Sequence, residues 1–517
     1  MHAKEGVLVV DLGTTVCKAV LFDPLGGILG SGARRMDIQR PQDGAAEQDP
    51  ESWWAAASSA VRQALAAAPR DAVAAVALCG QRESVVPVDD RMRPLHPALL
   101  WMDARGWDLA DRWRTRMGAR VRAWTGLVPG APYTAGKIHW WLRHRPDVAA
   151  RTRWYLQAKD WLVHRLTGEV VTDATLAART MLYNPFARRW QPELLGDLGV
   201  SASRFPTVLA STAWAGGVRP EAAQDWGVAA GTPVLVGGGD RPCEALGLAL
   251  EAGEVMESSG TTSNVATLAD HPRPGHPAVS ATPHVLPGRW LWELGLAGTG
   301  AVLERLGEWF GGAPLDWRQL DHALARTRPG ADGLLALPLL LGARAPRWNR
   351  RVRGAIAGLH QGHSAEDWLR AAAEGIAYEL RAALDALAAA GAPSRVVRVT
   401  GGLSRCAQWN RIKASVYGRP VIQSEVAYGA AFGAFLLAAG RLDWPVEEAV
   451  ARRRAAVAAV HDPDPAETRL YEAGYALYEA LHRQLLPLWP RLEEYRAQSR
   501  KIMPQNLTDP HASDEGL

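Results

Sequence analysis

The hydrophobic pattern near the start of the chain predicts a β-hairpin. Residues 7–10 are consecutive apolar residues, as in a buried strand, and residues 19–22 form a second apolar run. Between them, residues 11–15 read Asp-Leu-Gly-Thr-Thr, and Gly13 supplies the backbone freedom that a tight bend or a close ligand requires. Glycine motifs this short also occur in ordinary polar turns. The pattern alone therefore leaves open whether the bend binds a ligand.

Further along the chain, short apolar runs alternate with longer amphipathic stretches. The runs predict strands at 73–78, 85–88, 233–236, 254–257, 265–268, 333–341 and 396–399. The amphipathic stretches predict helices at 50–68, 109–125, 245–250, 301–310, 365–390, 408–417 and 465–499. Strands that alternate with helices are typical of the α/β class. Several strands end in polar loops, which is where α/β folds place ligand-binding groups.

The first bend recurs in the second half of the chain. Residues 258–262 read Ser-Ser-Gly-Thr-Thr between two strand-like runs, as residues 11–15 do. This repeat indicates a diverged internal duplication; the alternative is a coincidence of common turn residues. The hydroxyls and backbone N–H groups of Thr14 and Thr15 suit an anion, and Lys18 adds positive charge nearby. Asp11 is placed where a carboxylate could hold a hydrated metal ion.

One aspartate stands out after a predicted strand. Residues 237–239 are three glycines, and Asp240 follows them directly, with Pro242 two residues later. Pro242 suits the first turn of a helix, so Asp240 is expected at or near the helix N-cap, where the positive helix end favours the ionised carboxylate. A cap is one interpretation of Asp240, and a general base is the other.

Composition narrows the class of protein. The chain has 517 residues, which suggests two or more domains. Its formal charge of +4 is small and its basic residues are dispersed, so we expect no nucleic-acid partner. Neither a signal-peptide pattern nor an apolar run of membrane-spanning length is present, so we expect no membrane partner. The 4 cysteines are far apart, which favours free thiols and a cytoplasmic protein over a metal cluster.

The order of the motifs resembles one family, the FGGY carbohydrate kinases, which include glycerol kinase, xylulokinase and gluconokinase. The resemblance spans most of the chain and rests on DLGTT at 11–15, GQRES at 80–84, LWMDAR at 100–105, GGGD at 237–240, SSGTT at 258–262, GARAPRWN at 342–349, TGGLS at 400–404 and YGAAFGA at 428–434. It implies two actin-like (ribonuclease H-like) α/β domains with a cleft between them. We expect an N-terminal domain over 1–248 that binds the sugar and carries the base. A nucleotide-binding domain over 249–490 and a partly disordered tail over 491–517 follow.

The same resemblance implies an ATP-dependent kinase that uses Mg²⁺. It places Asp240 as the base that accepts the substrate hydroxyl proton, and Asp11 with Asp240 at the metal. The residues it implies for the nucleotide and its phosphates are Thr14, Thr15, Lys18, Gly260, Thr261, Thr262, Gly300, Gly401 and Gly402.

The residues that the resemblance implies for substrate binding match more than one subfamily. They are Gln81, Arg82, Glu83, Trp101, Asp103, Tyr133, Asp240 and Arg241. Arg82 and Glu83 resemble the glycerol-kinase loop, whereas the Asp103 motif is closer to xylulokinase and gluconokinase. The substrate is therefore expected to be a small polyol or sugar that is glycerol-, xylulose- or gluconate-like. A homodimer or another homo-oligomer is also expected.

Two other functions were weighed against the kinase. The first is a catalytically silent, nucleotide-binding regulatory protein on the same fold, because fold alone does not determine function. Intact Asp240, Arg82 and Glu83 argue against it. The second, a Rossmann dehydrogenase, fails because no G-x-G-x-x-G motif follows the first strand with an acidic residue at the required distance.

Overall fold

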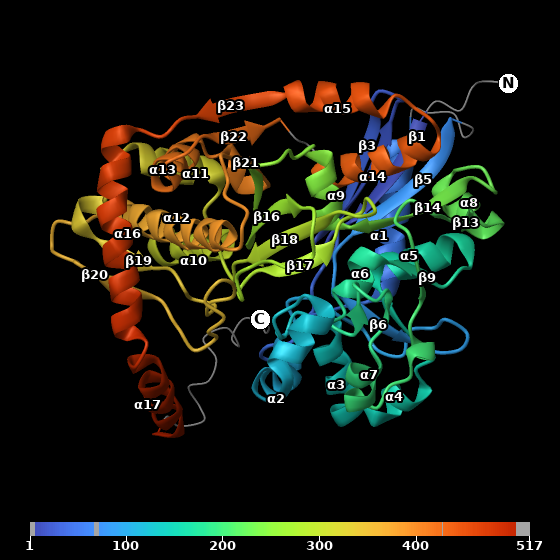
Figure 1. The fold of residues 1–517 in the computed structure, drawn as a ribbon, viewed down its shortest axis with the longest axis horizontal. Coiled ribbons are helices and arrows are strands. Elements are labelled where there is room, and N and C mark those ends of the chain that lie inside the picture. The colour runs from blue at the N-terminus through green and yellow to red at the C-terminus, as the bar shows by residue number, and fades with distance from the viewer. Residues whose placement is uncertain (1–5, 67–71, 426–427, 503–517) are drawn as a thin grey trace, which may run out of the picture.

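Two large β-sheets organise the chain, one in each half (Figure 1). The computed structural model describes residues 6–66, 72–425 and 428–502. The first sheet runs in the order β13 (Trp214–Gly217), β14 (Pro233–Gly239), β5 (Val73–Gly80), β1 (Gly6–Leu12), β2 (Val16–Phe22) and β3 (Ile28–Arg35). The second runs in the order β17 (Ser280–Pro283), β18 (Trp290–Gly295), β16 (Ser263–Ala269), β15 (Glu254–Ser259), β21 (Val396–Thr400), β22 (Val421–Ser424) and β23 (Val457–His461). The predicted α/β class is confirmed.

Each sheet is built around a hairpin that carries a Gly-Thr-Thr turn. In the first hairpin, β1 pairs antiparallel with β2 and parallel with β5. In the second hairpin, β15 pairs antiparallel with β16 and parallel with β21. The identical pairing supports the duplication interpretation of the two turns. Both turns lie at the carboxyl end of a central strand, where two sheets that face each other bring their loops together.

Helices and smaller sheets complete the first half. The helices are α1 (Pro50–Ala64), η1 (Ala104–Gly106), α2 (Trp107–Thr125), α3 (Thr134–His144), α4 (Pro146–Arg151), α5 (Ala158–Thr167), α6 (Ala174–Ala178), α7 (Pro192–Leu198), η2 (Ala202–Arg204), α8 (Pro220–Trp226) and α9 (Asp240–Gly247). The small strands are β4 (Glu47–Gln48), β6 (Val85–Val88), β7 (Ala98–Leu99), β8 (Trp154–Gln157), β9 (Val171–Asp173), β10 (Tyr183–Asn184), β11 (Arg189–Trp190) and β12 (Thr207–Leu209).

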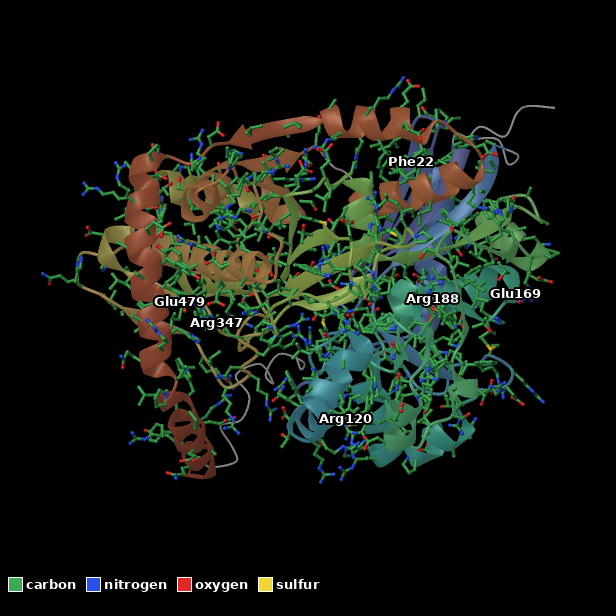
Figure 2. The ribbon with its side chains drawn as sticks, viewed as in Figure 1. Phe22, Arg120, Glu169, Arg188, Arg347 and Glu479 are labelled. Atoms are coloured by element: carbon green, nitrogen blue, oxygen red, sulfur yellow. The ribbon has the colours of Figure 1, made fainter. Side chains whose placement is uncertain are left out.

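The second half is richer in long helices. They are α10 (Gly300–Gly311), α11 (Trp317–Ala325), η3 (Ala331–Gly333), α12 (Ala365–Ala389), η4 (Gly402–Arg405), α13 (Ala407–Tyr417), α14 (Gly429–Arg441), α15 (Val446–Ala455), α16 (Pro465–Leu485) and α17 (Leu488–Ile502), with a small sheet of β19 (Leu335–Leu337) and β20 (Ala355–Ala357). Helix α12 is buried along most of its length, and α16 runs across the edge of this half (Figure 1). Figure 2 shows Arg347 beside Glu479 of α16, with which it forms an ion pair of 2.5 Å.

Helix α14 belongs to the second half of the sequence but packs on the first sheet. It contacts β1, β5 and α9. Phe435 lies 5.0 Å from Phe22 of β2, which Figure 2 labels at this contact. A Cβ on Gly433 would lie 1.8 Å from the carbonyl oxygen of Cys243, so only glycine lets α14 approach α9 this closely. Helix α14, from the second half of the sequence, thus connects the two halves by packing on the first sheet.

One local prediction was wrong. The apolar run at 333–341 is not one strand, because β19 ends at Leu337, directly before Pro338, which has no N–H to continue a ladder. The stretch at 465–499 divides into α16 and α17. The prediction for Asp240 is confirmed, because Gly239 is the N-cap of α9 and Asp240, directly beside it, is the first residue of the helix.

Some predictions stay untested. The domain boundaries at 248 and 490 stay predictions, and residues 503–517 of the expected tail lie outside the described residues. Within the described ranges, no helix combines the length and the apolar character needed to cross a membrane.

Candidate active site

A pocket of about 590 Å³, open to solvent, lies between the two halves, and we call it the cleft pocket. Its lining comes from β14–α9, from loops of the first half, and from β16, β18 and the 342–349 loop of the second half. The lining residues are Thr14, Arg82, Glu83, Trp101, Pro132, Arg179, Asp240, Arg241, Thr262, Ser263, Asn264, Gly295 and Arg344. Thr14 and Thr262 bring the two Gly-Thr-Thr turns to the same pocket.

Asp240 enters the cleft pocket at the N-terminus of α9. Its side chain is about one third exposed, and its Oδ1 lies 3.3 Å from Nε of Arg82. A Cβ on Gly239 would lie 2.6 Å from Cδ of Arg82, so the glycine before Asp240 makes room for this approach. Burial raises the pKa of Asp240, while Arg82 and Arg241 act to lower it. The result is a more basic carboxylate that neighbouring cations help to keep ionised.

A buried ionic network crosses from the first half to the second. Glu293 of β18 accepts a bidentate pair from Arg82, at 3.0 and 2.9 Å, and a further bond from Arg179 at 3.0 Å. Arg179 also pairs with Glu83. Burial would raise the pKa of Glu293, but the two arginines overcome it and hold that pKa well below its usual range. The network positions Arg82 beside Asp240 and depends on residues from both halves.

Some predicted substrate-binding residues line the cleft pocket, and others contact the residues that line it. Nε1 of Trp101 donates to Oγ1 of Thr14 at 2.9 Å. Oε1 of Gln81 accepts hydrogen bonds from the hydroxyls of Thr14, at 3.3 Å, and Ser84, at 2.7 Å. Gln81 therefore links the first Gly-Thr-Thr turn to the loop that contains Ser84. The ring of Tyr133 lies under the guanidinium of Arg179, 4.9 Å away.

Asp103 is held away from the cleft pocket. Its carboxylate binds the side chain of Arg105 and accepts from the backbone N–H of Ala46 at 2.9 Å. It also accepts from the backbone N–H of Arg105 and thereby caps η1. The structure therefore does not bring Asp103 to the substrate wall.

The remaining residues predicted to bind the nucleotide cluster around the second Gly-Thr-Thr turn. The backbone N–H of Gly300, which begins α10, donates to the carbonyl of Gly260 at 2.9 Å. Gly401 has φ of 88°, and a Cβ there would lie 2.2 Å from the carbonyl oxygen of Ser259. Gly402 has no atom within 4 Å of such a Cβ, so its backbone is open to a ligand. The second turn, the start of α10 and the Gly401–Gly402 loop therefore form one continuous surface.

Asp11 has the surroundings of a metal-binding carboxylate. It lies opposite Lys18 in the β1–β2 ladder. Burial raises its pKa to about 6; Lys18 acts against this increase, and the carboxylates of Asp240 and Glu244 add to it. Among the described residues Asp11 forms no ion pair. The neighbouring carboxylates of Asp11 and Asp240 fit Mg²⁺, which binds oxygen ligands and keeps several waters.

Several residues of this site were not predicted from the sequence, and four of them have polar side chains that matter for its geometry. Arg179 and Glu293 form the buried network, and Asn264 and Arg344 line the cleft pocket. Arg344 stands in the GARAPRWN motif, which was recognised without a role for this side chain. Asn264 follows the SSGTT motif by two residues, and Arg179 and Glu293 lie in segments whose pattern gave no functional signal.

Comparisons with known proteins agree with this geometry. Residues 6–247 match the N-terminal domain of the FGGY family of carbohydrate kinases, and residues 255–441 match its C-terminal domain. The xylulose kinase of Escherichia coli K12 is 29% identical over 488 residues, covering 93% of this chain and 99% of that protein. The gluconokinase of Bacillus subtilis 168 is 27% identical over 454 residues, covering 84% and 88%.

Solved structures extend the agreement to the fold. A xyloylose kinase from Brucella ovis superposes with a TM-score of 0.85 at 31% identity, covering 93% of this chain and 99% of that one. Plasmodium falciparum glycerol kinase with ADP shares the fold alone, with a TM-score of 0.82 at 19% identity and coverage of 93% and 98%. The expected pair of actin-like domains is confirmed. The two matched domains together span most of the chain, so this protein belongs to the FGGY family of carbohydrate kinases, which use ATP to phosphorylate a sugar or polyol.

Proposed function

We propose that Asp240 is the general base of this kinase and that the cleft pocket holds the acceptor hydroxyl between Asp240 and the γ-phosphate of ATP. The observation that carries the proposal is the position of Asp240, which stands at the N-terminus of α9 in a pocket lined by both halves. Its raised pKa makes the carboxylate a better proton acceptor. The hydroxyl proton would pass to Asp240 as the oxygen attacks phosphorus.

The phosphates and the metal would lie on the side of the Gly-Thr-Thr turns. Thr14, Thr15 and Lys18 would meet the transferring phosphate, and the second-turn residues Gly260, Thr261, Thr262 and Gly300 the remaining ones. Gly401 and Gly402 would run along the adenosine. Mg²⁺ would be held by Asp11 and Asp240, where it neutralises phosphate charge. The first half would thus supply the reacting groups and the second the nucleotide platform.

The acceptor would bind to the polar groups that line the cleft pocket. Arg82, Glu83, Trp101 and Arg241 are the predicted residues that reach it directly. Gln81, Tyr133 and Asp103 would act indirectly, since their contacts hold the loops that carry the wall. Asp240 and Arg82 both line the cleft pocket, which supports the kinase over the silent regulatory alternative.

Location and assembly complete the proposal. The 4 cysteines are free and buried, which suits a reducing compartment such as the cytoplasm. A homodimer or another homo-oligomer is proposed, and light scattering coupled to size-exclusion chromatography tests it.

The decisive experiment replaces the base. Asp240→Asn keeps the shape of the side chain but removes its ability to accept a proton. We expect the turnover of the sugar to fall by about 10²–10⁴-fold, the usual contribution of a general base. ATP binding, measured by calorimetry, should be retained. Asp270→Asn, at an exposed loop position, is the matched control and should keep full activity. Near-normal turnover in Asp240→Asn would reject the assignment.

A further inference from the structure

The turn that carries Asp240 has no side chains of its own to hold it in place. Residues 237–239 are glycines, Gly237 has a φ of 67°, and the pairing of β14 with β5 shifts register between Leu235 and Gly238. Glycine has more backbone freedom than any other residue. The position of the Asp240 carboxylate therefore depends on groups that bind this turn from outside.

Two buried side chains bind the backbone at the two ends of the turn. Nζ of Lys159 donates to the carbonyl oxygen of Val236, directly before the glycines, at 2.9 Å. Oγ1 of Thr175 accepts from the N–H of Gly239, the last glycine, at 2.8 Å. These two bonds fix where the turn begins and where the helix with Asp240 starts.

Asp173 joins the groups that bind the turn. Its Oδ2 accepts from the hydroxyl of Thr175 at 2.6 Å and from the hydroxyl of Ser211 at 3.0 Å. The backbone carbonyl of Ser211 in turn accepts from the N–H of Gly237 at 3.0 Å. Because the Thr175 hydroxyl donates to a carboxylate, its rotation is fixed and its lone pairs are left for the backbone N–H of the turn. We call Lys159, Asp173, Thr175 and Ser211 the glycine-turn clamp.

The charges of the clamp are paired within the protein. Nζ of Lys159 lies 3.4 Å from Oδ1 of Asp173 and 3.5 Å from Oδ1 of Asp160. Asp160 also accepts from the N–H of Gln157 and completes the capping box of α5, and burial raises the pKa of Asp160 to about 6. The clamp therefore needs neither a substrate nor a metal to be complete.

The clamp is buried away from the cleft pocket. Lys159, Asp173 and Thr175 are 0% exposed and Ser211 is 5% exposed. None of the four is among the described residues that line the pocket. They come from α5, β9, α6 and the segment before β13, and α5, β9 and α6 all pack against β14 (Figure 1). An effect of the clamp on the reaction must therefore pass through the backbone of the turn.

We propose that Thr175 and Asp173 are positioning residues for the base, which hold the glycine turn so that the carboxylate of Asp240 meets the acceptor hydroxyl. The proposal rests on the assignment of Asp240 made above. Neither positioning residue touches the acceptor or the nucleotide. Their contribution should therefore appear in the rate of phosphoryl transfer and not in the binding of either substrate.

The test removes one hydroxyl from the clamp. Thr175→Val keeps the shape of the side chain and the backbone N–H that Asp173 caps, but it leaves Gly239 without its acceptor. We expect kcat to fall about 10- to 100-fold, because a displacement of about 1 Å can cost about 10²-fold in rate. The KM values for the acceptor and for ATP should stay unchanged. Thr175→Ser keeps the hydroxyl and should restore most of the turnover. ADP release is measured with whichever of D-xylulose, D-gluconate and glycerol the wild type phosphorylates.

Thr125→Val is the matched control. The hydroxyl of Thr125 is also buried in the first half, donates to the carbonyl of Val121 at 2.7 Å and accepts from the N–H of Leu127 at 3.2 Å. Its removal should cost stability as Thr175→Val does, and kcat should stay at the wild-type value. An equal loss of kcat in both variants would assign the effect to stability and overturn the proposal.

A double variant shows whether Thr175 acts through the base. In the Asp240→Asn protein, Thr175→Val should change the residual turnover by less than about 2-fold, because residues that act as one unit are not additive. A structural role would lower turnover equally in both backgrounds. Ser211→Ala removes the other hydroxyl from Asp173 but keeps the carbonyl that binds Gly237. It should lower kcat less than Thr175→Val, again only where Asp240 is present.

The outcomes separate this proposal from the one it rests on. A near-normal kcat in Thr175→Val, with turnover that Asp240→Asn abolishes, overturns the clamp and leaves the base assignment intact. A fall that persists in the Asp240→Asn background, or that appears in KM, also overturns the clamp. If Thr175→Val does not fold, Ser211→Ala decides by the same criteria. Near-normal turnover in Asp240→Asn overturns both proposals.

Discussion

The two Gly-Thr-Thr hairpins share their strand pairings but differ in how their carboxylates are used. In the second hairpin, Glu257 is buried, and its oxygens lie 2.6 Å from Nζ of Lys413 and 2.9 Å from the hydroxyl of Tyr417. In the first hairpin, Asp11 forms no ion pair among the described residues and lies near Asp240 and Glu244 instead. The first hairpin thus carries a carboxylate whose nearby lysine, Lys18, only partly offsets the effect of burial, and the second carries one that forms a direct ion pair.

The difference shows how a repeated scaffold divides its tasks. A buried carboxylate with a lysine and a tyrosine holds α13 against its sheet, and it contributes to stability. A buried carboxylate with a raised pKa lowers stability when it is ionised, and a bound cation would relieve this cost. The chemistry therefore concentrates on the first hairpin, while the second gives a rigid platform. Three predictions test this division.

The largest expected effect is on stability, at Glu257. Glu257→Gln keeps the side-chain shape but leaves Lys413 buried and without its counter-charge. We expect a loss of about 3–5 kcal/mol in the free energy of unfolding, measured by urea denaturation. The molecules that stay folded should keep their turnover. Glu304→Gln, at an exposed position on α10, should leave stability unchanged. A stable Glu257→Gln that is inactive would reverse the comparison.

The second prediction concerns activity, at Asp11. Asp11→Asn removes the charge that we assign to hydrated Mg²⁺, and groups that contact a metal indirectly typically change activity by about 10- to 100-fold. We expect a turnover lower by this factor and a higher Mg²⁺ concentration for half-maximal activity. The free energy of unfolding should not fall. Loss of stability with normal turnover would show that Asp11 is structural, as Glu257 is.

The smallest effect is a pH dependence of stability, measured without Mg²⁺. The pKa of Asp11 is raised to about 6 in the folded protein, above its ordinary value of 3.8. Between these values the folded state holds the proton more tightly than the unfolded chain, so this carboxyl lowers stability as pH rises through the window. Asp11→Asn should therefore gain stability relative to the wild type at pH 7.5 but not at pH 3.5. An equal difference at both pH values would contradict the unpaired carboxylate.

The sequence predicted the parts of the site that are local. The strand of residues 7–10 is apolar throughout, and Asp11 with its turn follows it directly, so pattern and motif coincide. Asp240 follows three glycines in the same way, although the cap of its helix is Gly239. These features depend on residues that are neighbours in the chain, so a sequence pattern can predict their local geometry.

The sequence did not predict contacts between distant segments. Arg82 and Glu293 are 211 residues apart, and nothing in the pattern of β18 marks Glu293 as the partner. Asp103 shows the converse, since its motif indicated the substrate wall and the fold used it to hold Arg105. Helix α14 looks like any apolar helix, and only the close approach of Gly433 to α9 explains its place on the first sheet.

The α/β class, the repeated hairpins, the family resemblance and the place of Asp240 at the start of a helix all follow from the sequence, because each is encoded within a few neighbouring residues. Tertiary structure alone decided which charges are neutralised. Arg82 and Arg179 pair with Glu293, and Lys413 pairs with Glu257. The physical reason is that the energy of a buried charge depends on what surrounds it in space, and that surrounding is assembled only when the two halves meet.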